Sequence, residues 1–161
     1  MCSMEKLLVF ALSGLHCALR LSEIERVLHA VEITPVPKAP EIVMGLVNVQ
    51  GRVIPVLNIR KLLRLPEIET SLNDRIILAR TSTCPVAILV ENVLGISEFS
   101  EREIIAPAEL YPGIEYLDGV SKLEGGILYI YNLDRFLSSA EKSEIEHLLS
   151  EGISMPADQE T

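Results

Sequence analysis

Tryptophan is absent from this chain of 161 residues, and aromatic residues make up only 4% of it. Proteins that hold bases or sugars by stacking need aromatic platforms, so the composition disfavours that class. Lys and Arg are also few, 14 against 23 Asp and Glu, which gives a formal net charge of −9. Because affinity for nucleic acid comes largely from neutralising phosphates, this charge argues against a nucleic-acid partner.

Cysteines and long apolar runs are scarce too. The three cysteines, Cys2, Cys17 and Cys84, have no regular spacing and do not make a disulfide framework. The longest uncharged run, Leu7–Leu19, has thirteen residues, whereas a membrane span needs about 20 apolar residues. The start, Met1–Lys6, lacks the basic residues and the cleavage site of a signal peptide. We therefore expect a soluble, cytoplasmic protein without direct membrane insertion.

Motifs that carry chemistry are missing as well. His16 lies next to Cys17, but the chain has no C-x-x-C or H-x-x-x-H spacing, and a zinc site needs about four such ligands. We expect Cys17 to be a small buried hydrophobe instead. The histidines fall in no nucleophile–base signature, and Gly125-Gly126 precedes a predicted strand rather than a helix that could hold a phosphate. The sequence therefore predicts no catalytic residues, no metal site and no cofactor.

Hydrophobic residues are abundant, at 48%, and part of the chain is repeated. Gly45–Leu63 aligns with Gly119–Leu137 at an offset of 74 residues, with four identical pairs. These pairs are Gly45/Gly119, Gly51/Gly125, Asn58/Asn132 and Leu63/Leu137. A weaker match at an offset of 69 aligns Cys17–Ile24 with Val86–Val93 and Leu7–Val9 with Ile76–Leu78. Since the order is the same in both halves, we interpret the chain as two copies of one small β unit.

Nine segments have the aliphatic content and flanking turn signals of short strands. They are Leu7–Leu12, Leu15–Leu21, Met44–Val49, Val53–Leu57, Arg75–Arg80, Pro85–Glu91, Asn92–Glu98, Gly119–Leu123 and Ile127–Tyr131. Ser13-Gly14 and Gln50-Gly51 are tight-turn signals, because glycine adopts a positive φ at little cost. Many short strands with turns between them predict a mostly β protein built from small barrels.

Other segments indicate helices and connections. Asn58 and Asn132 follow strands and are predicted N-caps of one or two helical turns. A capping-box pattern at Ser138–Glu141 predicts a C-terminal helix that runs to Leu149, followed by a flexible tail over 151–161. Three prolines within Ile33–Pro40 predict an extended connection with few hydrogen bonds.

The segment Ile33–Arg60 carries a family likeness. Its proline-containing start leads to Gly45, Asn48 and Gly51 and then to Val53-Ile-Pro-Val-Leu-Asn-Ile-Arg60. This order closely resembles the signature of CheW-like chemotaxis coupling proteins, and the other repeated segments are similar to that family too. The resemblance covers roughly residues 5–150. It implies two intertwined five-stranded SH3-like barrels with a short C-terminal helix, with lobes of approximately 7–65 and 75–137 by sequence.

The resemblance also implies a function. Members of this family are non-enzymatic adaptors that couple the cytoplasmic tip of a chemoreceptor to the regulatory domain of the histidine kinase CheA in bacterial or archaeal arrays. Such a protein would lie in the cytoplasm, at receptor arrays on the inner face of the membrane. The alternative is a CheW-like interaction module in a different chemosensory-type pathway, such as motility, biofilm or gene regulation, with a non-standard partner.

Positions in the motif imply two groups of contact residues. The expected kinase-binding residues are Ile24, Met44 and Gly45. The expected receptor-binding residues are Arg26, Val27, Asn48, Gln50 and Gly51. Two of these depart from the family pattern: Gln50 replaces the common Arg, and Arg26 stands where a Glu often pairs with that Arg. For the aliphatic Val27 and for Val49, burial in the core is at least as well supported by the sequence as a role in binding.

Overall fold

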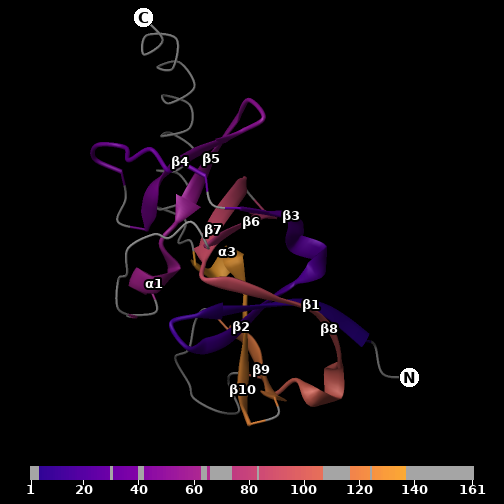
Figure 1. The fold of residues 1–161 in the computed structure, drawn as a ribbon. Helices are drawn as coiled ribbons and strands as arrows, with labels where there is room; N and C mark the ends of the chain where they lie inside the picture. The colour runs from indigo at the N-terminus through magenta and orange to yellow at the C-terminus, as the bar shows by residue number, and fades with distance from the viewer. Residues whose placement is uncertain are drawn as a thin grey trace, which may run out of the picture.

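The computed structural model describes residues 4–29, 31–39, 42–62, 65, 74–82, 84–106, 117–123 and 125–136. Within these residues the chain is mostly β (Figure 1). The strands are β1 (Met4–Leu12), β2 (Leu15–Arg20), β3 (Ile24–His29), β4 (Val43–Val49), β5 (Arg52–Leu57), β6 (Arg75–Arg80), β7 (Pro85–Val90), β8 (Asn92–Ser100), β9 (Leu117–Leu123) and β10 (Gly126–Tyr131). The short helical elements are η1 (Leu21–Glu23), α1 (Ile59–Leu62), η2 (Glu101–Glu103) and α3 (Leu133–Phe136).

The strands form two five-stranded sheets. The terminal sheet has the order β8-β1-β2-β10-β9, and the central sheet has the order β3-β6-β7-β5-β4. Figure 1 shows the central sheet above the terminal sheet, with α3 between them. The predicted mostly β fold with two five-stranded units is confirmed. The predicted C-terminal helix and the tail over 151–161 lie outside the described residues.

The sequence repeat corresponds to an exchange of hairpins. The first copy supplies β1–β5 and the second supplies β6–β10, but β1 and β2 pair with strands of the second copy, and β6 and β7 pair with strands of the first. The register is the same in both sheets: Val56 pairs with Ala87 in the central sheet, and their repeat equivalents Ile130 and Ala18 pair in the terminal sheet. The sheets are therefore built from 24–90 and from 4–20 with 92–131, so each contains strands of both sequence halves.

Alternation along the exchanged strands explains their unbroken apolar sequences. On β6, Ile76 and Leu78 face the core of the central sheet, while Ile77 and Ala79 belong to a larger cluster that also contains Phe10 from β1. This larger cluster draws on both sheets, and a third cluster fills the terminal sheet. Strands buried on both faces read as continuous hydrophobic runs. The main core therefore lies where the two sheets meet.

Local signals in the sequence are mostly confirmed. Gln50 and Gly51 have φ values of 52° and 86°, so this hairpin turn has the positive φ angles that its sequence predicts. The Asn58 side chain accepts a hydrogen bond from the Lys61 amide at 3.2 Å, which confirms its predicted capping role. The proline-rich connection differs from its prediction, because Thr34 and Leu46 exchange two backbone hydrogen bonds of 2.8 Å.

Candidate functional site

The predicted contact residues all lie on the central sheet. Ile24, Arg26 and Val27 belong to β3, which is one edge of this sheet. The remaining residues belong to the other edge: Met44, Gly45 and Asn48 on β4, and Gln50 and Gly51 in the turn that follows it. The two edges approach each other at one end only, where Glu25 of β3 forms an ion pair with Arg52, the first residue of β5. Ile24 and Arg26, which flank Glu25, therefore lie near the turn. Met44 and Gly45 lie toward the other end of β4.

Exposure separates residues that can contact a partner from residues that hold the fold. Val27 is 37% exposed, and Arg26, Asn48, Gln50 and Gly51 are exposed as well. Ile24 and Met44 are half-buried and pack against the apolar clusters. Gly45 is buried, and so is Val49, which lies in the core of the central sheet. Val27 is therefore on the surface, whereas Val49 is a core residue.

Gly45 is required by a close backbone approach. A Cβ atom at this position would lie 2.5 Å from the carbonyl oxygen of Thr34 and 2.8 Å from the Ile33 side chain. Its repeat equivalent, Gly119, is packed in the same way, since a Cβ there would lie 2.4 Å from the Ile104 side chain. Both glycines let a neighbouring segment bridge to the strand. The repeat of this glycine thus has a packing cause.

The turn after β4 is held rigidly. The Oδ1 atom of Asn48 accepts a hydrogen bond of 2.9 Å from the Gly51 amide. Side-chain hydrogen bonds of this kind stabilise tight turns. The turn therefore presents Gln50 at its tip, while part of the Asn48 side chain is used within the turn.

An ion pair beside this turn was not predicted from the sequence. The Arg52 guanidinium donates to both carboxylate oxygens of Glu25, at 2.5 and 3.4 Å. The hydrogen bond from Arg52 lowers the pKa of Glu25 below its ordinary value. A register shift between Ile24 and Arg26 marks the β-bulge that contains Glu25. Glu25, which precedes Arg26, and Arg52, which follows the Gln50-Gly51 turn, are thus paired with each other.

Two polar networks stabilise the sheets and the connections between them. In the first, which lies within the terminal sheet, Arg20 of β2 forms ion pairs with Glu5 at 2.8 Å and with Asp118 of β9 at 3.2 Å, next to the η1 connection. Burial and the nearby Asp118 carboxylate raise the pKa of Glu23 in η1. The second network links the two sheets, because it joins Glu91 to Arg60 of α1 and to the turn after β1. The sequence offered no spacing signal for either network.

The described residues contain no arrangement typical of a catalytic centre. Cys17 is fully buried, and burial raises the pKa of its thiol to about 12, so it is protonated at neutral pH. The prediction that it is a small buried hydrophobe is confirmed. In the same part of the chain no three His, Cys, Asp or Glu side chains lie close enough to hold a metal ion.

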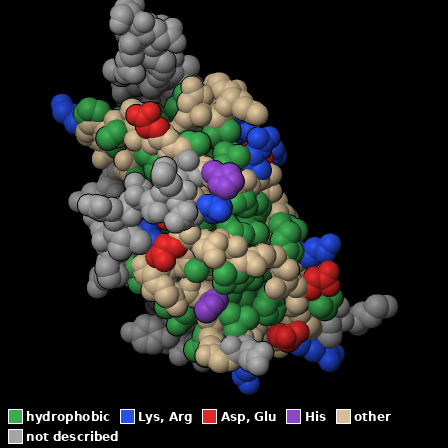
Figure 2. Space-filling model, viewed as in Figure 1, with side chains coloured by type: hydrophobic (Ala, Val, Ile, Leu, Met, Phe, Trp, Pro, Cys, Tyr) green, Lys and Arg blue, Asp and Glu red, His purple; other side chains and the backbone are tan. Residues whose placement is uncertain are grey.

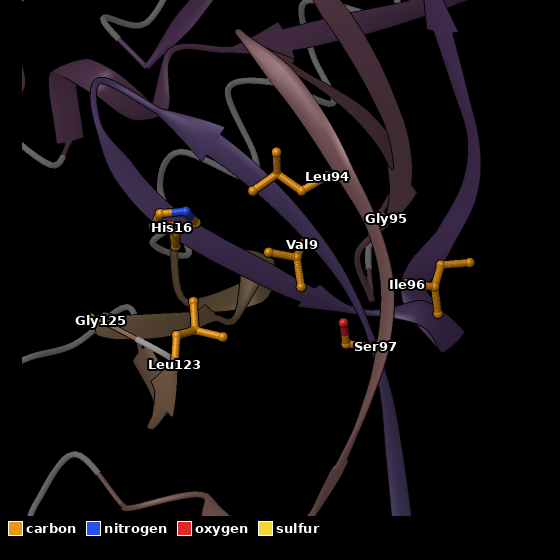
Figure 3. Close-up of a pocket in the computed structure, with 9 residues that line it drawn as sticks. Val9, His16, Leu94, Gly95, Ile96, Ser97, Leu123 and Gly125 are labelled. Carbon is orange, nitrogen blue, oxygen red and sulfur yellow. The ribbon is translucent and has the colours of Figure 1, made fainter.

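The terminal sheet carries a hollow of about 330 Å³. Figure 3 shows the side chains of Val9, His16 and Leu94 gathered around it, with Leu123 on the side of the β9–β10 turn. Leu94 is 50% exposed. In Figure 2 a band of hydrophobic side chains runs down the visible face between scattered charged groups. Apolar surface is thus present on both sheets, whereas the predicted contact residues lie on one.

The duplicated topology can now be compared with known proteins. The model of the CheW-like domain matches residues 6–141. The chain belongs to the CheW-like domain family. A protein named Chemotaxis protein CheW from Thermotoga maritima is 30% identical over 139 residues, which cover 86% of this chain and 91% of that protein. Protein FrzA from Myxococcus xanthus is 24% identical over 139 residues, 84% of this chain and 87% of that protein.

A solved structure has the same fold as this CheW-like chain. It is described as the crystal structure of scaffolding protein TtCheW from Thermoanaerobacter tengcongensis. The TM-score is 0.77 at 23% sequence identity, and the match covers 86% of this chain and 96% of the other. Among the described residues, none of the helices has the length and apolar character that crossing a bilayer would require.

Proposed function

We propose that this CheW-like protein is a non-enzymatic adaptor that couples chemoreceptors to the histidine kinase CheA. The observation that carries the proposal is the family match over residues 6–141. Relatives that are named as chemotaxis proteins also align with this chain over most of their length. In this role the protein works in the cytoplasm, at receptor arrays on the inner face of the membrane. Its partners are the regulatory domain of CheA and the cytoplasmic tip of a receptor.

The proposed mechanism is assembly. An adaptor with two separate contact surfaces holds kinase and receptor at a fixed distance, and several weak contacts of this kind give a stable lattice. The Glu91 network between the sheets supports the proposal, because a rigid body transmits geometry better than two loosely joined lobes. We propose that Ile24 and Met44 face the kinase, and that Gly45 takes part by keeping the β4 backbone beside Met44 close to Thr34. The proposed receptor-facing residues are Arg26 and Val27 on β3, Asn48 on β4, and Gln50 and Gly51 in the turn that follows.

The test uses two matched apolar positions, one on each sheet. Val27 on β3 and Ile127 on β10 are both exposed, 37% and 50%. We expect Val27→Glu to weaken binding to the CheA regulatory domain or to a receptor-tip fragment by about tenfold or more, because exposed apolar side chains anchor interfaces. Ile127→Glu is the control and should change affinity by less than about twofold.

Isothermal titration calorimetry with the purified chain and each purified partner measures both effects. A wild-type chain that binds neither partner contradicts the coupling role. Binding to another pathway's purified kinase instead would favour the alternative of a module in a different chemosensory-type pathway. A far-UV circular dichroism spectrum for each variant checks that it is folded.

A further inference from the structure

Three arginines surround one glutamate at the end of the central sheet where β3 and β5 begin and β6 ends. Arg52 forms the ion pair with Glu25 described above, and the Nε atom of Arg80 lies 3.9 Å from the same carboxylate. Arg26 follows Glu25 in the chain and interacts with it electrostatically. One carboxylate cannot neutralise three guanidinium groups, so this cluster carries an excess of two positive charges.

The arginines are placed to receive a further anionic group. A hollow of about 310 Å³ is lined by Arg52 and Arg80, together with Thr81, Cys84 and Pro85. The Arg80 side chain is 72% exposed and the Arg52 side chain is 48% exposed. Within the described part of the chain, the terminal nitrogens of Arg80 make no hydrogen bond, and neither does the exposed side chain of Arg26. Guanidinium groups present donors in a planar fork that fits a carboxylate.

Charge makes this cluster unusual for the molecule. The whole chain has a net charge of −9, so its overall charge disfavours an acidic partner. A local excess of positive charge then determines where such a partner can dock, since complementary charges steer association and set orientation. The cluster also borders the Gln50-Gly51 turn through Arg52, so it is continuous with the proposed contact surface.

We propose that the hollow lined by Arg52 and Arg80, together with Arg26 of the same arginine cluster, binds a carboxylate-bearing segment of the protein partner that docks on the central sheet. The proposal rests on the adaptor function and adds the sign of the partner's charge and the residues that recognise it. Arg80 and Arg26 make the new contacts, while Glu25 holds Arg52 in place.

The experiment compares charge reversals of equal size on the two sheets. Arg80→Glu changes the lining of the hollow and Arg26→Glu changes the arginine cluster. Arg102→Glu in η2 is the control, because Arg102 is exposed on the terminal-sheet side. Affinity for the purified CheA regulatory domain and for a purified receptor-tip fragment is measured by surface plasmon resonance at about 50 and about 300 mM NaCl.

We expect Arg80→Glu and Arg26→Glu each to weaken binding to one of the two partners by about tenfold at low salt. The salt dependence of that affinity should also decrease, because fewer screened charge contacts remain. Arg102→Glu should stay within about twofold of wild type. Replacing the partner's contacting Glu or Asp by Lys should restore binding to Arg80→Glu.

The outcomes separate the two proposals. If wild type binds but the Arg80→Glu and Arg102→Glu variants are indistinguishable for both partners, the basic hollow is overturned and the adaptor function stands. If wild type binds neither partner, the adaptor function is overturned, and the site proposed for its partner is overturned with it. Thermal unfolding checks that each variant is folded. We expect Arg80→Glu to leave the fold intact, because the Arg80 side chain is largely exposed.

Discussion

The Arg60 guanidinium donates a hydrogen bond of 2.8 Å to the Glu91 carboxylate, although only 9% of the Arg60 side chain is exposed. The same carboxylate oxygen accepts a hydrogen bond of 2.6 Å from the Ser13 amide. Glu91 thus satisfies a buried cation in α1 and a backbone donor in the β1–β2 turn at once. Because Ser13 belongs to the terminal sheet and Arg60 follows the central one, Glu91 is a link between the sheets.

Removing the Glu91 carboxylate should destabilise the protein. In Glu91→Ala the buried Arg60 side chain loses its counter-charge and the Ser13 amide loses its acceptor, so we expect the free energy of unfolding to fall by about 1–3 kcal/mol. Urea unfolding followed by circular dichroism measures the change. Glu98→Ala, at an exposed position on β8, serves as the control. Equal stabilities for the two variants would show that the link contributes nothing.

Acid should affect the contributions of Glu91 and Glu23 to stability with opposite signs. Burial alone would raise the pKa of Glu91, but the hydrogen bonds from Ser13 and Arg60 outweigh it and hold this pKa below 4.5. Stability from Glu91 is therefore present above pH 4.5 and is lost as the pH falls through the lower folded-state pKa. The pKa of Glu23 is raised above 4.5, so its ionisation costs stability at neutral pH, and this cost disappears as the pH falls through the raised value.

The corresponding variants make this prediction measurable. Glu23→Gln should be more stable than wild type at pH 7, and the two should converge at pH values below 4.5. Glu91→Gln should be less stable than wild type at pH 7, and this difference should also shrink in acid. Urea unfolding at a series of pH values gives both curves. A Glu23→Gln variant that is less stable at neutral pH would contradict the burial of its charge.

Even the smallest side chain at position 45 should destabilise the protein. In Gly45→Ala the added carbon meets the Thr34 carbonyl oxygen, and the backbone must shift. Such overpacking costs about 1–3 kcal/mol. Gly126→Ala is the matched control, because nothing lies within 4 Å of its Cβ position. Urea midpoints compare the two, and a Gly45→Ala midpoint equal to that of Gly126→Ala would contradict the close approach. Binding defects of Gly45 variants must therefore be measured on folded protein.

Ser121 carries a buried hydroxyl that has no hydrogen-bond partner in the described residues. Its repeat equivalent in the central sheet is Val47, a core residue. Burying an unpaired hydroxyl is unfavourable, so Ser121→Ala should raise the free energy of unfolding by about 1 kcal/mol. Ser97→Ala, at an exposed position on β8, should leave stability unchanged. Thermal unfolding distinguishes the two, and a destabilised Ser121→Ala would reveal a partner for the hydroxyl.

Much of the fold could be read from the sequence because its strands are buried. Nine of the ten strands in the described residues have apolar runs next to turn signals, and all nine are confirmed in type. The strand β3 was missed because it is an edge strand whose residues are half-buried or exposed. The repeat indicated two copies of one unit, but strand exchange depends on which hairpin pairs with which, and local patterns do not encode this.

The candidate site was less accessible to sequence reasoning. Motif positions gave Arg26 and Gln50 as departures from the family, and the structure places Arg26 on β3 and Gln50 in the turn after β4. The Glu25–Arg52 pair depends on a bulge in β3 and on an approach of two strands 27 residues apart in sequence. The bulge and the approach of the strands have no signature in the order of residues. The only signal in the sequence is the presence of Arg52 directly after a predicted tight turn, and it does not identify Glu25 as the partner.

The exchanged hairpins also affect how the protein is made. A ribosome releases β1 and β2 first, yet the strands that flank this hairpin in the sheet, β8 and β10, are encoded at least 70 residues later. The nascent chain can complete the central sheet from residues 24–90 while its first hairpin still lacks both flanking strands. Synthesis of residues 92–131 then completes the terminal sheet around that hairpin. Translation that stops before β8 would release a polypeptide with an unprotected apolar ribbon, a natural target for chaperones and proteases.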